Sequence, residues 1–127
     1  VEAELTESID GQRYPLYRIA PLSGNIALHW SKDSLDVSLS VNIADAQDEV
    51  SSLQNETTTP GYAVWNLNMH YQVTPALTLS LIAENLLDKE YAQHLGGVNR
   101  VVDSEVAVGQ KVPEIGRNIG LHAEYAF

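Results

Sequence analysis

The end of the chain alternates strictly between apolar side chains and small or polar ones. In GRNIGLHAEYAF the apolar positions are Ile119, Leu121, Ala123, Tyr125 and Phe127. A period of two is typical of a β-strand with one apolar and one polar face. Chain ends are usually frayed and polar. Because this pattern continues to the last residue, we predict that residues 117–127 form a strand that includes the C-terminus.

Four earlier segments show the same alternation. They lie at residues 25–30, 35–43, 62–73 and 77–84. The segment 35–43 is the clearest, because Leu, Val or Ile alternates there with Asp, Ser or Asn. We therefore predict an all-β fold, an antiparallel meander of about five strands.

The connections between these segments alternate in length. Short turns are expected at 31–34 and 73–76, and long loops at 8–22, 45–60 and 91–116. We expect residues 1–7 to end an earlier strand. The alternation blurs at residues 85–91, which either hold a β-bulge or end the strand.

Composition excludes several classes of protein. The net charge of -10, from 17 acidic and 7 basic residues, opposes binding to nucleic acid, which depends on neutralising phosphates. No run of about 18 apolar residues predicts a transmembrane helix, but a membrane β-strand needs only about 10 alternating residues. The absence of cysteine excludes disulfides and thiolate metal sites. No nucleophile with acid and base partners is recognisable, so we expect neither an enzyme nor a bound cofactor.

Two architectures fit this pattern, a membrane barrel and a soluble antiparallel β-sandwich that binds or scaffolds a partner. Alternation of short turns with long loops favours the barrel. The polar faces also carry Asn, Ser, Gln and His rather than the Lys and Glu of a solvated surface. Four aromatic residues close to the short turns resemble a membrane-interface girdle, namely Trp30, Tyr71, Tyr125 and Phe127. We favour the barrel and keep the sandwich as the alternative.

Particular motifs carry a resemblance to a known family. LTLSLIAENLLDKEYAQHLGGVNR (77–100) and VPEIGRNIGLHAEYAF (112–127) resemble the C-terminal end of TonB-dependent outer-membrane receptors. ENLLDKEY (84–91) is similar to the motif that ends the penultimate strand, and PEIGRN (113–118) to the Gly-Arg that opens the last one. Residues 20–30 and 59–81 resemble the preceding strands, so the resemblance covers essentially the whole chain.

The resemblance implies a fold and a function. The fold is a transmembrane β-barrel of about 22 strands around an N-terminal plug, in the outer membrane of a Gram-negative bacterium. The function is uptake of a scarce nutrient, driven by TonB through an N-terminal box. Residues 1–127 would be the C-terminal portion of such a barrel, a fragment without the plug, the box and most strands. We expect the substrate to be a ferric siderophore, a metal or a metal chelate.

The resemblance and the alternation together assign roles to the two faces. The residues expected to face lipid are Leu35, Val37, Leu39, Val41, Ile43, Leu77, Leu79, Leu81 and Leu121. The four aromatic residues are expected at the periplasmic interface, where Phe127 would also serve the barrel assembly machinery. The residues expected to face the lumen or the plug are His29, His70, Glu84 and His122. A metal shared by these histidines would need long reach, because strands two apart lie about 10 Å from each other.

The long loop at 91–116 holds the candidate substrate ligands, His94, Asp103 and Glu105. Imidazole and carboxylate groups suit many divalent metals, and the loop is expected on the extracellular side. The alternative is that these are ordinary solvated loop residues. Gly96 and Gly97 in the same loop are expected to serve the backbone conformation.

Overall fold

The computed structural model describes residues 6–9 and 11–127, which divide into two compact units. The sheet unit comprises residues 23–44, 62–90 and 115–127, and the loop unit comprises residues 1–22, 45–61 and 91–114. Among the described residues, no helix has the length and apolar character needed to cross a membrane.

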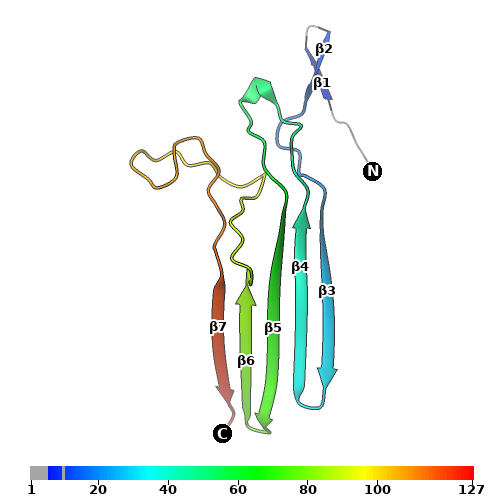
Figure 1. Cartoon of the computed structure of the whole chain (residues 1–127), viewed down its shortest axis with the longest axis vertical. Coiled ribbons are helices and arrows are strands. Elements are labelled where there is room, and N and C mark those ends of the chain that lie inside the picture. The colour runs from blue at the N-terminus through cyan, green and yellow to red at the C-terminus, as the bar shows by residue number, and fades with distance from the viewer. Residues whose placement is uncertain (1–5, 10) are drawn as a thin grey trace. The chain divides into compact units, whose positions relative to one another are not determined.

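The sheet unit is a five-stranded antiparallel meander in which each strand pairs with its neighbours in sequence (Figure 1). Its strands are β3 (Ser23–Lys32), β4 (Leu35–Ala44), β5 (Tyr62–Thr74), β6 (Leu77–Glu84) and β7 (Asn118–Tyr125). The predicted meander is thus confirmed.

The last strand is shorter than the alternation predicts. β7 ends at Tyr125, which pairs with Leu77, the first residue of β6. The N–H of Ala126 still donates to the carbonyl of Ala76 at 2.8 Å, but Phe127 lies beyond the strand and is fully exposed. Opposite Phe127, β6 has not yet begun, because its first residue, Leu77, pairs with Tyr125. The apolar alternation therefore extends two residues beyond the β6–β7 pairing.

The turns at this end of the sheet use local hydrogen bonds. Asp33 in the β3–β4 turn has φ 53°, a left-handed conformation that Asp adopts more readily than most residues. In the β5–β6 turn the hydroxyl of Thr74 accepts from the N–H groups of Ala76 and Leu77 at 3.2 and 3.0 Å. The register shifts between Gln72 and Thr74, so β5 has an irregularity just before this turn.

The register places all nine residues expected to face lipid on one face of the sheet. For example, Leu39 on β4 lies opposite Leu28 on β3 and Leu67 on β5. Leu81 and Leu121 pair in the same way on β6 and β7. This face has no covering layer within the sheet unit, and Leu121 is 77% exposed. Soluble monomers rarely expose a continuous apolar patch larger than a few hundred Å².

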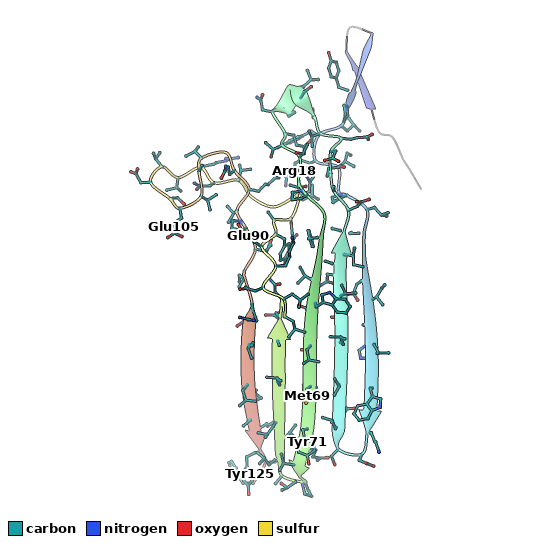
Figure 2. All side chains as sticks on the ribbon, viewed as in Figure 1. Arg18, Met69, Tyr71, Glu90, Glu105 and Tyr125 are labelled. Carbon is teal, nitrogen blue, oxygen red and sulfur yellow. The ribbon has the colours of Figure 1, made fainter. Side chains whose placement is uncertain are left out.

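The predicted aromatic positions gather at the short-turn end. Figure 2 shows Tyr71 and Tyr125 near the β5–β6 turn, and the register places Trp30 opposite Val37, close to the start of β4. These three aromatic side chains share the apolar face.

The opposite face carries His29, His70, Glu84 and His122, as the alternation predicts. His70 Nδ1 lies 2.8 Å from the hydroxyl of Ser80, and Ser80 also pairs with His122 in register. Asn118 donates to Oε2 of Glu84 at 3.0 Å. Across the part of the chain that the structure describes, no group of three His, Cys, Asp or Glu residues could hold a metal ion.

The loop unit contains a small hairpin, β1 (Thr6–Ile9) and β2 (Gln12–Pro15), and one 3-10 turn, η1 (Ser52–Gln54). The prediction of an unbroken loop at 8–22 is therefore wrong. The missed signal is the Asp-Gly pair between Ile9 and Gln12, since Asp-Gly is a strong hairpin-turn sequence. The expected strand at 1–7 lies mostly outside the described residues, and its last two residues belong to β1.

The side chain of Asn85, in a residue only 3% exposed, closes the connection after β6. Its Oδ1 accepts from the N–H of Lys89 at 2.8 Å and its Nδ2 donates to the Lys89 carbonyl at 2.9 Å. The N–H of Asn85 donates to Oδ1 of Asn66 at 3.0 Å. Asn85 has φ 50° and β6 ends at Glu84, although the N–H of Leu86 still donates to the Trp65 carbonyl of β5 at 2.8 Å.

Asp88 joins this connection to the start of β7. Its Oδ1 accepts from the N–H of Arg117 at 2.8 Å, and a Cβ at Gly116 would lie 2.9 Å from the same oxygen. The ENLLDKEY and PEIGRN motifs therefore meet in space. The side chains of Asn85 and Asp88 bond to backbone groups of this connection.

We predict that Asn85→Ala lowers the free energy of unfolding by about 1–3 kcal/mol, because the part-buried N–H and carbonyl groups of Lys89 lose their partners. Asn55→Ala is the matched control, since Asn55 also has positive φ (52°) but is exposed and so tests backbone strain alone. Urea titration in detergent, followed by tryptophan fluorescence, measures both variants. Equal losses in the two variants would contradict the role of the Asn85 side chain.

Candidate ligand-binding site in the loop unit

His94 is the most deeply buried titratable side chain described in the loop unit, with its residue 4% exposed. Its Nδ1 lies 2.9 Å from the hydroxyl oxygen of Thr59, and its Nε2 lies 3.2 Å from Oε1 of Glu56. An ionised carboxylate only accepts hydrogen bonds. We therefore assign the hydrogen to Nε2, so that in the neutral ring Nδ1 accepts from Thr59.

The carboxylate of Glu56 accepts several hydrogen bonds. Its Oε1 accepts from the N–H of Arg18 at 2.9 Å, and its Oε2 accepts from the N–H of Ser51 at 3.0 Å. Its side chain is 5% exposed. Burial by itself raises the pKa of Glu56, but the backbone donors of Ser51 and Arg18 and the nearby His94 together outweigh it and lower the pKa below its ordinary value of 4.5. Glu56 is therefore ionised at neutral pH.

These contacts tie three loop segments together. Arg18 belongs to the segment after β2, Glu56 to the segment between β4 and β5, and His94 to the segment before β7. Nη2 of Arg18 also donates to the Leu95 carbonyl at 3.2 Å, and Gln47 Nε2 donates to the carbonyl of Ile19 at 3.0 Å. The three segments are therefore held by polar contacts.

The third segment has its own internal supports. Nζ of Lys111 donates to the carbonyls of His94 and Gly96. The buried side chain of Asn99 donates to the carbonyls of Val101 and Val106, which closes the turn that carries Asp103.

A cavity of about 410 Å³ opens among these three segments. Such a volume lies within the range of about 300–1,000 Å³ that is typical of small-molecule sites. Three cationic side chains line it, those of Arg18, Arg100 and Lys111, and Glu56 is its one carboxylate. Three of the chain's seven Lys and Arg residues therefore meet at this cavity, although the whole chain carries a net charge of -10.

The structure does not bring the three predicted ligands together. His94 lines the cavity, but both of its ring nitrogens are engaged. Asp103 and Glu105 are exposed and do not line it. Figure 2 shows Glu105 on an outlying turn, away from Arg18. As placed, His94 joins loops through both of its ring nitrogens, and a substrate-binding role for these three residues stays a prediction.

Sequence reasoning missed four charged residues that line the cavity, namely Arg18, Glu56, Arg100 and Lys111. They lie in three different polar segments, and no spacing within one segment marks them as a group.

Comparisons with known proteins identify the family. Residues 2–86 match the family described as "TonB dependent receptor-like, beta-barrel". The chain belongs to this family, whose barrels lie in the outer membrane of Gram-negative bacteria and whose members are transporters rather than enzymes. The predicted family and location, and the expectation that the chain is not an enzyme, are thereby confirmed.

Among solved structures, one described as "Copper transporter OprC" has a similar fold, with a TM-score of 0.74 and 22% sequence identity. The match covers 91% of this chain and 18% of that chain, so this chain spans less than a fifth of that transporter. At this identity the likeness concerns the fold alone. A comparison with curated proteins finds no match.

The lowered pKa of Glu56 predicts the acid sensitivity of the loop unit. A carboxylate whose pKa is depressed on folding stabilises the fold fully above its unfolded pKa, and this contribution is lost as the pH falls through the folded pKa. Protection of the Ser51 and Arg18 amides from hydrogen exchange should therefore be steady near pH 7 and fall below about pH 4.5.

Glu56→Gln should lower this protection by about tenfold at pH 7, since hydrogen bonds to a charged acceptor are among the stronger ones. It should also flatten the acid profile. Glu49→Gln is the control, because Glu49 is an exposed carboxylate of the same segment outside this set of contacts. An unchanged pH profile in Glu56→Gln would show that Glu56 does not hold the loops.

Proposed function

We propose that this chain is the C-terminal part of the barrel of a receptor that imports a scarce nutrient across the outer membrane. Transport would be coupled to TonB, and a plug domain of the same protein would occupy the lumen. The proposed substrate is a metal or metal chelate, with ferric siderophores as the leading candidates. The observation that carries the proposal is a single sheet with one continuous apolar face, in a chain of the barrel family.

The two faces of the sheet fit two different environments. The apolar face, with Leu39 and Leu121, suits contact with lipid, and the aromatic residues at its short-turn end suit the membrane interface. The opposite face suits a plugged lumen. Its hydrogen-bonding groups, such as His70 and Asn118, are mostly uncharged and would meet another polar surface. Phe127, free at the chain end, suits recognition by the barrel assembly machinery.

The alternative of a soluble sandwich has less support. A sandwich needs a second sheet against the apolar face. The sheet unit, in the residues the structure describes, holds one sheet only, and the chain belongs to a barrel family. The similarity to the copper transporter does not make copper the substrate of this chain, because 22% identity supports a shared fold only.

Uptake measurements test the proposed function. Cells with and without the receptor gene would be given radiolabelled iron(III) chelates and copper(II), with and without a working TonB system. We expect receptor-dependent uptake of at least one metal chelate, lost when TonB is inactive. Unchanged uptake of every metal compound after loss of the gene would refute a role in metal import.

The orientation of the sheet predicts an asymmetry between adjacent residues of β4. Leu39→Arg should cost about 2–4 kcal/mol of barrel stability if Leu39 faces the lipid near the middle of the membrane. Ser40→Arg is the matched control, since Ser40 lies on the opposite face. Folding into vesicles, measured as the folded fraction in urea, compares the two variants. Equal losses, or a larger loss for Ser40→Arg, would contradict this orientation.

A further inference from the structure

We propose that the cavity of the loop unit binds the anionic part of a small soluble ligand, so that the receptor selects a negatively charged metal chelate over a bare metal cation. This inference rests on the proposed function and deepens it. It concerns the cavity lined by Arg18, Arg100 and Lys111.

The charge of the cavity is opposite to that of the chain. Three cationic side chains line it, against one carboxylate. The negative charge of that carboxylate, Glu56, is already shared among the N–H groups of Arg18 and Ser51 and the imidazole of His94. The cavity therefore keeps an excess of positive charge, which favours an anion.

Two of the cations are held in position at the cavity wall. Arg18 is fixed through the Leu95 carbonyl, and Lys111 through the carbonyls of His94 and Gly96. A guanidinium group has five N–H donors and an ammonium group has three, so both keep donors for a ligand. Donors that are already positioned lose less conformational entropy on binding.

A bare cation finds little to bind here. The ring nitrogens of His94 are both engaged, and the described residues include no trio of His, Cys, Asp or Glu suited to a metal ion. The three cationic side chains would also repel it. A chelate with exposed carboxylate, phenolate or phosphate oxygens avoids both problems, since its own oxygens meet the cations.

Substitutions at Gly97 test directly whether the charge of the cavity governs ligand binding. It lines the cavity, and a Cβ added there meets nothing within 4 Å. Gly97→Asp therefore adds a negative charge without steric cost, and Gly97→Asn is its isosteric control. Arg100→Gln removes a positive charge from an exposed residue, with Arg100→Lys as the variant that keeps the charge.

Binding to the detergent-solubilised receptor would be measured with a negatively charged iron(III) tris-catecholate, an uncharged iron(III) trihydroxamate and copper(II) alone. We expect the tris-catecholate to bind best. Gly97→Asp and Arg100→Gln should each weaken it about three- to fivefold at low salt, as expected for a partly exposed charge pair, and less in high salt. Gly97→Asn and Arg100→Lys should stay within about twofold.

Tighter binding of copper(II) alone, or equal binding of the charged and uncharged chelates in all variants, would overturn the inference. So would binding of lipopolysaccharide vesicles that depends on Arg100 while neither chelate binds, since the anion would then be a membrane phosphate. Uptake of an uncharged chelate alone would leave the proposed function standing and remove this inference. If no metal compound shows receptor-dependent uptake, both the proposed function and this inference are refuted.

Discussion

The alternation of side chains across one hydrogen-bonded sheet is the constraint on which the rest of this chain depends. The ladders from β3 to β7 satisfy the backbone, which is the condition for a strand to lie in lipid. The sheet unit buries only a few apolar residues, namely Val41, Ala44, Val64 and Ala83, and its leucines lie on an uncovered face. Its stability as a barrel wall therefore depends on the environment of each face, and the two faces need different environments.

The loop unit is held together by buried polar groups rather than by alternating faces. Its buried polar residues include Ser51, Thr59, His94 and Asn99, and among the described residues no buried side-chain polar atom lacks a partner. A polar network of this kind holds loops in place where an apolar core is too small to do so. Within it, the Glu56 carboxylate accepts hydrogen bonds from the N–H groups of Arg18 and Ser51 and from Nε2 of His94.

A sheet unit with an apolar face and a loop unit with a polar cavity suit different tasks in a receptor. In the proposed receptor the sheet would carry the loops, and the side chains of the loops would bind the ligand. The motifs that identify the family stabilise the connection between the strands. Asn85 and Asp88 close the connection between β6 and β7 and touch no candidate ligand site. Family motifs in this chain therefore identify the architecture. The identity of a ligand depends instead on loop residues that carry no motif.

The sequence by itself determined the strands. Period two is a local property, so β4, β5 and β6 begin and end within a residue of the alternation, and the apolar face follows from it. The end of β7 and the β1–β2 hairpin were misjudged, because pairing partners and turn chemistry decide them. Only the tertiary structure decided whether His94 is exposed or buried, and which groups it contacts. Its burial against Glu56 and Thr59 depends on residues 38 and 35 positions away in the chain, and no local pattern records contacts of that range.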